Sequence, residues 1–332
     1  MTAPIVHGGG VTAAAAIHGG KPSDWLDLST GINPCPVQIP ALDPAVWHRL
    51  PDQCLADAAR QAAQAYYRSG AILPLPVPGT QSVIQLLPRL SEAGRRVAIF
   101  APTYGEYRRV FELAGVAVDA VTSLGQITPA HGLVVVVNPN NPDGRTFSPE
   151  TLSLLWQTLR AQNATLLVDE AFGDCVPDVS VAGNVEDMPG LVVFRSFGKF
   201  FGLAGLRLGF VIAEPSIQQR FAEGLGPWAV SGPALAIADQ LMRGATDTIL
   251  TAITERNAAL TSVLHEAGLK IAGGTPLFAL VADPRAEALH RHLCEHHILV
   301  RPFDYAPEWL RFGLTPDNDA DLRLVAAFSR WS

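Results

Sequence analysis

The chain has 332 residues, 48% of them apolar and 17% charged, so it is long enough to bury a large core in one or two domains. Its formal net charge is −7, and acidic and basic residues are interspersed without a block of one sign. This composition gives no indication of nucleic-acid or anionic-membrane binding, and apolar runs such as LVVVV at 133–137 are too short to span a bilayer.

The first 45 residues are rich in glycine and proline and are expected to form an N-terminal arm (1–45). The middle of the chain then alternates strand-like and helix-like segments. The expected strands are VAIF (97–100), VAVDAV (116–121), LVVVV (133–137), TLLVDEAF (165–172), LVVFR (191–195) and GFVIA (209–213). These runs hardly alternate, as expected for parallel strands covered on both faces, so we predict an α/β domain at 46–230.

Helical patterns lie between these strands, at 104–115 and from Ser148, where serine is the N-cap and Pro149 the first helical residue. Past residue 230 the pattern changes to long helical stretches at 234–243 and 247–267, followed by short strands at 271–281, 298–300 and 309–313. This part predicts a smaller α+β domain at 231–332.

Polar side chains follow several of the predicted strands. Asn141 lies in the turn after LVVVV, Asp169 ends TLLVD, and Ser196 and Lys199 follow LVVFR. Ligands bind at the carboxyl ends of strands in open parallel sheets, so these groups are expected to share one crevice. Gly79, Thr80 and Gln81 open a further predicted helix, whose backbone N–H groups could hold a phosphate.

Lys199 and Arg207 both lie in the apolar segment SFGKFFGLAGLRLG (196–209) and are expected to be buried. Burial would suit an imine-forming amine that needs a lowered pKa, and an arginine that meets a phosphate dianion. An aspartate, an asparagine, a serine, a lysine and an arginine in one crevice are the groups that bind pyridoxal phosphate.

NPNNPDG (138–144), VDEAF (168–172) and SFGKFFGLAGLRLG, in this order and spacing, resemble the class I/II aminotransferase superfamily of fold-type I pyridoxal-phosphate enzymes. The resemblance implies a three-layer, aspartate-aminotransferase-like large domain with a smaller C-terminal domain, and a homodimer. It also implies a site residue set: Lys199 as the Schiff-base lysine, Asp169 at the pyridine nitrogen, Asn141 at the phenolic oxygen, Tyr104 stacked on the ring, and Gly79, Thr80, Ser196 and Arg207 around the phosphate.

Two positions depart from relatives of this superfamily. Many relatives have tyrosine where VDEAF has Phe172, so one hydrogen bond to the phenolic oxygen should be missing. Histidinol-phosphate aminotransferases commonly have a tyrosine in a YPD segment that reaches the partner subunit's phosphate, whereas RLPDQ here has Leu50.

The N-terminal sequence resembles that of one group within this superfamily. HGGGVTAAAAIHGG followed by WLDLSTGINP is similar to threonine-phosphate decarboxylases of cobalamin biosynthesis, and ILVRPF and LRFGL resemble segments that carry anion-binding arginines. The implied substrate-binding residues are His7, Ile32 (main chain), Asn33, Arg301 and Arg311.

The implied reaction is pyridoxal-phosphate-dependent decarboxylation of L-threonine O-3-phosphate to (R)-1-amino-2-propanol phosphate, so the expected partner is a small phosphorylated amino acid. The main alternative is an aminotransferase acting on histidinol phosphate or another amino acid. A further alternative is a cofactor-binding relative without catalysis, against which the retained pair of Lys199 and Asp169 argues.

The four cysteines are far apart and form no CxxC pair, and the N-terminus lacks the basic start of a signal peptide. A reduced, cytoplasmic location is therefore expected. His292 and His296 are four residues apart in HRHLCEHH, but no third ligand is placed by the spacing, so we expect a solvated helix face and no metal.

Overall fold

The computed structural model describes residue 5 and residues 7–331, and divides them into two compact units. The large unit comprises residues 37–141 and 146–246. The small unit comprises the described residues up to Pro36, together with 142–145 and 247–331. Each unit has its own sheet and is described by itself.

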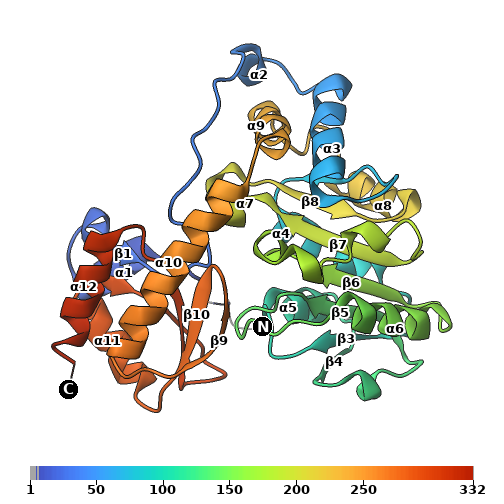
Figure 1. The fold of residues 1–332 in the computed structure, drawn as a ribbon. Helices are drawn as coiled ribbons and strands as arrows, with labels where there is room; N and C mark the ends of the chain where they lie inside the picture. The colour runs from blue at the N-terminus through green and yellow to red at the C-terminus, as the bar shows by residue number, and fades with distance from the viewer. Residues whose placement is uncertain (1–4, 6, 332) are drawn as a thin grey trace. The chain divides into compact units, whose positions relative to one another are not determined.

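The large unit is built on a seven-stranded sheet with the strand order β2-β8-β7-β6-β5-β3-β4 (Figure 1). Its strands are β2 (Leu75–Val77), β3 (Arg96–Phe100), β4 (Val118–Val121), β5 (His131–Val137), β6 (Thr165–Asp169), β7 (Leu191–Ser196) and β8 (Gly209–Ile212). The neighbours from β7 to β4 are parallel, whereas β8 is antiparallel to both β7 and β2. The expectation that all these strands are parallel is therefore wrong for β8.

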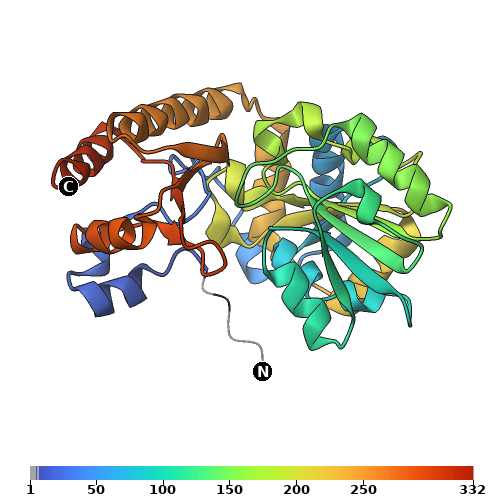
Figure 2. The ribbon, with the colours of Figure 1, turned by 90° about the horizontal axis from the view of Figure 1, so that it is seen from below.

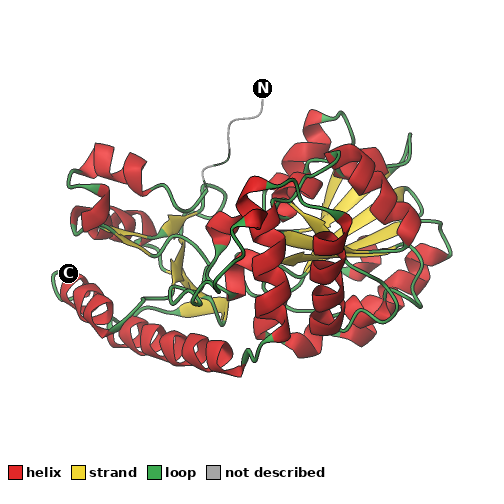
Figure 3. Ribbon diagram, turned by 90° about the horizontal axis from the view of Figure 1, so that it is seen from above, coloured by secondary structure: helices red, strands yellow, loops and turns green. Residues whose placement is uncertain are grey.

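Helices lie on both faces of this sheet (Figure 3). They are α2 (Ala45–His48), α3 (Gln53–Tyr67), α4 (Thr80–Ile84), α5 (Glu106–Leu113), α6 (Pro149–Arg160), α7 (Phe197–Phe200), α8 (Pro215–Leu225) and α9 (Gly232–Arg243). Short 3-10 helices lie at Leu87–Leu90, Leu124–Gln126, Gly173–Cys175, Pro177–Val179, Ala182–Asn184 and Ala204–Leu206. As predicted, Ser148 caps α6, because its hydroxyl accepts the Thr151 N–H at 3.3 Å.

Alternate residues of the central strands point to opposite faces. On one face Ile99, Val135, Leu167 and Phe194 pack in a single apolar cluster with Tyr107 of α5. Asp169 lies two residues after Leu167, on the same face of β6 and at the carboxyl end of the strand. Glu170 follows on the other face. The packing of this sheet therefore presents Asp169 toward α5.

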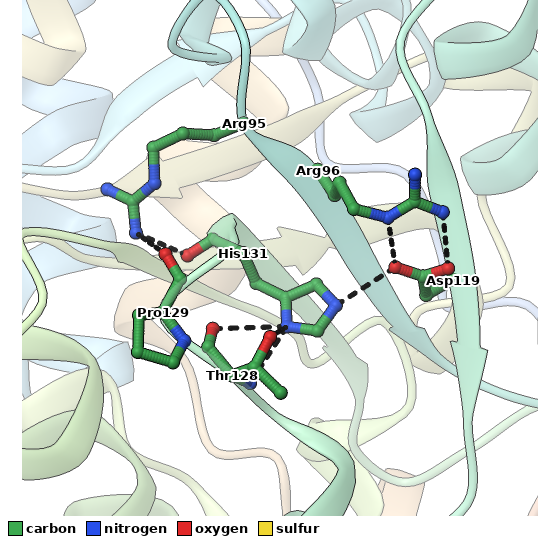
Figure 4. Close-up of polar contacts among 6 residues, drawn as sticks. All are labelled: Arg95, Arg96, Asp119, Thr128, Pro129 and His131. Atoms are coloured by element: carbon green, nitrogen blue, oxygen red, sulfur yellow. Dashed lines mark hydrogen bonds and ion pairs between the residues drawn. The ribbon is translucent and has the colours of Figure 1, made fainter.

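A polar cluster joins the N-terminal ends of three strands of this sheet (Figure 4). The Arg96 guanidinium donates to both carboxylate oxygens of Asp119 at 2.5 Å, and His131 Nε2 lies 3.1 Å from Asp119 Oδ2. Because His131 Nδ1 accepts the Thr128 N–H, Nε2 is the ring nitrogen that donates. The hydrogen bonds from Arg96 lower the pKa of Asp119 to about 2, although burial acts to raise it. This cluster ties β3, β4 and β5 together at their starts.

The small unit has a four-stranded sheet with the order β12-β13-β10-β9, and a separate parallel pair of β1 and β11. The strands are β1 (Leu26–Asp27), β9 (Ile271–Thr275), β10 (Phe278–Ala282), β11 (Ile298–Leu299), β12 (Arg301–Pro302) and β13 (Trp309–Gly313). The helices are α1 (Val11–His18), α10 (Asp247–Glu266), α11 (Ala286–Glu295) and α12 (Asn318–Phe328), with a 3-10 turn at Pro22–Asp24. Figure 2 shows α10 and α12 on one side of the small unit's sheet and α1 and α11 on the other.

The observed grouping differs from the expected division at 45/46 and 230/231. Up to Pro36 the described N-terminal residues belong to the small unit, because β1 pairs with β11 and the Gly313 N–H bonds to the Leu28 carbonyl at 2.7 Å. At the other boundary, α9 belongs to the large unit, where it packs against α3. No helix in the described part of the chain is long and apolar enough to cross a membrane.

Candidate active site

A cavity of about 260 Å³ lies in the large unit, where β5, β6 and β7 end. All eight residues that the sequence assigned to the cofactor line it: Gly79, Thr80, Tyr104, Asn141, Asp169, Ser196, Lys199 and Arg207. Gln81, Ala171, Phe172 and Gly198 are among the other lining residues. Residues from six separate segments of the sequence thus converge on one cavity.

Lys199 reaches this cavity from the short helix α7, which starts directly after β7. The preceding Gly198 makes the turn possible, because a Cβ there would lie 2.6 Å from the Cα of Ala204. Lys199 is half-buried, and its Nζ lies 5.8 Å from the centroid of the Phe172 ring. Phe172 is buried, so an aromatic face without a hydroxyl forms this part of the wall.

Arg207 also lines the cavity, but it is exposed, and the expectation of a buried guanidinium is wrong. Its backbone is in the left-handed region at φ 54°, at the corner between a 3-10 turn and β8. Its Nη1 donates to the Ala204 carbonyl at 3.1 Å. Arg207 thus lines the cavity and stays exposed, although its sequence neighbours are apolar.

Gly79, Thr80, Ser196 and Arg207 form one end of the cavity wall. Gly79 has φ 75°, and a Cβ on it would lie 2.8 Å from Arg207 Nη2. Ser196 is paired in register with Gly209, where a Cβ would lie 3.0 Å from Thr80 Cγ2. Ser196 immediately precedes α7, but its side chain makes no capping hydrogen bond to that helix. Ser196 lines the cavity instead. A hydroxyl and a guanidinium beside a glycine that leaves room fit a phosphate group.

Asp169 is a buried carboxylate with two donors. The Tyr107 hydroxyl donates to Oδ2 at 2.7 Å, and the Ala171 N–H donates to Oδ1 at 3.0 Å. Burial raises the pKa of Asp169 to about 6, while the Tyr107 hydroxyl, the Ala171 N–H and the charge of Lys199 act to lower it. A buried carboxylate opposite a lysine fits a cofactor ring with a protonated nitrogen.

Tyr107 was missed in the sequence analysis, although it lies three residues after Tyr104 in PTYGEYRR. At that spacing on an amphipathic helix, a buried tyrosine is first interpreted as core. The available signal was its position at the start of a helix that follows a strand of the central sheet.

Tyr104 is positioned by an amide. Its hydroxyl donates to Gln81 Oε1 at 3.0 Å, and Gln81 Nε2 donates to the buried carboxylate of Glu106 at 3.1 Å. The amide orientation of Gln81 is thereby set from both sides. The expected ring-stacking tyrosine and Gln81 are therefore linked residues of one wall.

Glu170 and Arg195 are chain neighbours of Asp169 and Ser196, but they lie on the opposite face of the sheet. Arg195 Nη1 contacts Glu170 Oε2 at 2.6 Å, and Nη2 lies 3.1 Å from Asp174 Oδ1. The guanidinium also lies 4.5 Å from the centroid of the Tyr67 ring. This fully buried ion cluster joins the ends of the two strands that carry site residues.

The small unit holds the five residues assigned to the substrate. Arg301 and Arg311 are paired in register across β12 and β13, and Arg311 Nη2 donates to the Ser29 carbonyl at 2.8 Å. Burial and the neighbouring Arg301 charge lower the pKa of Arg311 to about 10. Two adjacent guanidinium groups of this kind fit an anionic ligand.

The other three substrate residues lie on the N-terminal part of the small unit. His7 is exposed and precedes Gly8, where a Cβ would lie 2.3 Å from the Ser29 carbonyl oxygen. Ile32 is half-buried, and Asn33 is buried with its Oδ1 accepting the Cys35 N–H at 2.9 Å. The small unit thus brings the HGG segment and the Ser29 carbonyl beside Arg311.

His292 and His296 are bonded to the main chain rather than arranged around an ion. His292 Nε2 donates to the Ala327 carbonyl at 2.8 Å, and His296 Nδ1 lies 2.9 Å from the His292 carbonyl. Within residue 5 and residues 7–331, no group of three or more histidine, cysteine, aspartate or glutamate side chains is arranged to hold a metal.

The aminotransferase class I and II family model matches residues 23–328, so the chain belongs to that family and the predicted resemblance is confirmed. Among solved structures, histidinol-phosphate aminotransferase from Sinorhizobium meliloti, in complex with pyridoxal-5′-phosphate, has a TM-score of 0.80 at 21% identity, over 98% of this chain and 94% of that one. L-threonine-O-3-phosphate decarboxylase from Porphyromonas gingivalis has a TM-score of 0.73 at 20% identity, over 92% and 98%. These neighbours confirm the predicted fold class.

Two curated relatives are much closer in sequence. A threonine-phosphate decarboxylase from a Sinorhizobium species is 61% identical over 330 residues, 99% of each chain. Threonine-phosphate decarboxylase from Pseudomonas aeruginosa is 42% identical over 331 residues, 97% of each chain.

Proposed function

We propose that this protein is a pyridoxal-phosphate-dependent carboxy-lyase that converts L-threonine O-3-phosphate to (R)-1-amino-2-propanol phosphate in cobalamin biosynthesis. The observation that carries the proposal is the 61% identity, over 99% of both chains, with a threonine-phosphate decarboxylase. The alternative of a histidinol-phosphate aminotransferase is less supported, since such a relative from Cronobacter sakazakii is 30% identical over 80% of the chain.

The cofactor is pyridoxal 5′-phosphate, which when bound supplies a conjugated ring that accepts the electrons released at the substrate Cα. In this proposal Lys199 provides the amine that holds the cofactor covalently. After carbon dioxide has left, Lys199 Nζ returns a proton to Cα. Its half-buried position on α7 and its place in the cavity wall support both roles.

The other cavity residues bind and orient the cofactor. Asp169 pairs as a carboxylate with the protonated ring nitrogen, Asn141 donates to the phenolic oxygen, and Tyr104 stacks on the ring. Gly79, Thr80, Ser196 and Arg207 bind the phosphate, which is supported by the room that Gly79 leaves beside Arg207.

The small unit is proposed to bind the substrate. Arg301 and Arg311 meet its anionic groups, and His7, Ile32 and Asn33 contribute from the N-terminal part. The lowered pKa of Arg311 beside Arg301 supports this role, because an anion relieves the repulsion between the two cations. In a decarboxylase these residues would orient the substrate so that the bond to its carboxylate breaks, whereas in an aminotransferase they would orient it so that the Cα hydrogen leaves.

We also propose that the enzyme is a homodimer. Large apolar side chains are exposed on the large unit at Trp47 (65%), Leu50 (67%) and Trp228 (60%). The element carrying Trp47 packs on the start of α9, where a Cβ on Gly232 would lie 2.6 Å from the Val46 carbonyl oxygen. Trp228 lies just before α9, so these side chains belong to neighbouring segments, and contact with a second copy would cover them.

A cytoplasmic location is proposed from the cysteines. Cys35, Cys54, Cys175 and Cys294 all lie within the described residues and are free thiols. Free thiols are typical of a reducing compartment.

Substrate discrimination tests the proposal. The purified, cofactor-loaded protein should release carbon dioxide from L-threonine O-3-phosphate and form aminopropanol phosphate. Loss of one charge-assisted anion contact costs about 1.5–3 kcal/mol, so unphosphorylated threonine should bind at least about tenfold more weakly. Equal rates and affinities for the two amino acids would contradict the assignment of a phosphate-binding substrate site.

A further inference from the structure

Tyr107 of α5 donates a hydrogen bond to Asp169 from the interior of the large unit. Its ring is fully buried in the apolar cluster between α5 and the sheet, and only its hydroxyl reaches a polar group, Asp169 Oδ2 at 2.7 Å. The other carboxylate oxygen accepts the Ala171 N–H from its own strand end. Tyr107 therefore donates a side-chain hydrogen bond to Asp169, a carboxylate in the cavity wall.

We propose that Tyr107 is a positioning residue that keeps Asp169 ionised and oriented for a protonated ring nitrogen. The inference rests on the proposed function, because it gives Asp169 the cofactor ring as its partner. A fully buried carboxylate favours the neutral form unless donors stabilise its charge. Removal of one of two donors from Asp169 should therefore favour its neutral form.

The charged groups that act on Asp169, or on its neighbour Glu170, lie on α7, at the end of β6 and on β7. Lys199 on α7 acts to lower the pKa of the carboxyl, and Glu170, the next residue in the chain, acts to raise it. The Glu170 charge is in turn met by Arg195 on β7 at 2.6 Å. Tyr104 lies beside Tyr107, with ring centroids 6.3 Å apart, but donates to Gln81.

Burial, partly offset by these groups, leaves the pKa of Asp169 raised to about 6. In the wild-type protein the carboxylate is therefore ionised above that pH. Without the Tyr107 hydroxyl its pKa rises further, so near pH 6 the group becomes mostly neutral and cannot pair with a cationic ring. At higher pH the carboxyl is ionised in both proteins, so the difference between them should disappear.

The test is the affinity of the apoprotein for pyridoxamine 5′-phosphate, which lacks the aldehyde and cannot form a covalent bond to lysine. Titration calorimetry compares wild type with Tyr107→Phe. A hydrogen bond to a charged group predicts about tenfold weaker binding near pH 6 and less than about twofold weaker binding near pH 8.5. The near-normal affinity at the higher pH also shows that the variant is folded.

Tyr104→Phe is the matched control, because it removes a hydroxyl of the same cavity wall that donates to Gln81 instead of Asp169. Its affinity relative to wild type should not depend on pH. Equal weakening of Tyr107→Phe at every pH, no weakening at all, or the same pH dependence in Tyr104→Phe would each overturn the inference. If the wild-type protein itself fails to bind pyridoxamine 5′-phosphate at every pH, the proposed cofactor role of the cavity fails as well, and that result is seen in the wild-type arm alone.

Discussion

Single residues in the cavity wall owe their positions to close backbone approaches. Gly198 lets α7 turn against Ala204, and Gly79 leaves room for the Arg207 guanidinium. Short motifs carry these residues, which is why the sequence could place eight of them in one cavity. Tyr107 could not be placed in this way, because its partner Asp169 is 62 residues away and only the packing of α5 on the sheet brings them together.

Arg207 is a single residue whose exposure the sequence did not predict. Apolar neighbours on both sides predicted burial, but Arg207 is exposed at a corner whose backbone lies in the left-handed region at φ 54°. Sequence composition reports the average environment of a segment, whereas a single corner residue follows its own backbone conformation.

Replacement of Lys199 tests the most specific residue assignment. We expect Lys199→Ala to remove decarboxylation and the visible absorbance of covalently held cofactor, while the far-ultraviolet circular dichroism stays that of the wild type. Lys270→Ala is the control, because Lys270 is exposed and lies in the small unit. Full activity of Lys199→Ala would refute the cofactor assignment.

At the scale of elements, the ends of β6 and β7 are joined by the buried cluster of Glu170, Arg195 and Asp174. The charges of Asp174 and Glu170 more than offset the effect of burial, which acts to lower the pKa of Arg195, so its pKa is raised. Since Asp169 and Ser196 are the neighbouring residues on these strands, the cluster holds the strand ends that line the cavity.

Removal of the Arg195 cation should lower the free energy of unfolding. Arg195→Met leaves two buried carboxylates without their cation, and loss of one partner from a buried ion pair costs about 3–5 kcal/mol. Urea denaturation should show a drop of this size in the free energy of unfolding. Arg291→Met is the control, because its ion pair with Glu287 leaves 63% and 87% of the two side chains exposed, and should change stability by less than about 1 kcal/mol. A similar small change in Arg195→Met would show that the cluster does not stabilise the strand ends.

Most elements of the large unit followed from the sequence because parallel strands are short apolar runs separated by helical patterns. The direction of β8 did not, since GFVIA is equally compatible with a parallel and an antiparallel strand, and β8 pairs antiparallel with β7. β2 was missed because LPLPVP contains prolines, which an edge strand tolerates and a central strand does not.

At the scale of the whole chain, the N-terminal segment makes a long-range pairing that its composition does not reveal. Glycine and proline suggested an arm, but Leu28 is fully buried and β1 pairs with β11, which lies about 270 residues later in the sequence. A pairing over that distance leaves no local pattern, because a strand of two residues is too short to show periodicity.

The proposed assembly predicts twice the chain mass in sedimentation at low micromolar concentration. We expect Trp47→Glu combined with Leu50→Glu to shift the protein toward monomers, because two charges would then replace exposed apolar side chains of the proposed interface. Leu154→Glu changes an equally exposed leucine on α6 and should leave the mass unchanged. A wild-type protein that is both active and monomeric would refute the dimer.

The most direct test of the central claim is the fate of the substrate carboxyl group. The cofactor-loaded protein is incubated with carboxyl-labelled L-threonine O-3-phosphate in the presence of 2-oxoglutarate, and labelled carbon dioxide and glutamate are measured together. We predict one carbon dioxide released for each aminopropanol phosphate formed, with 2-oxoglutarate unchanged. A parallel incubation replaces threonine phosphate with histidinol phosphate. Stoichiometric formation of glutamate in that incubation, with threonine phosphate left untouched in the first, would contradict the decarboxylase and support an aminotransferase.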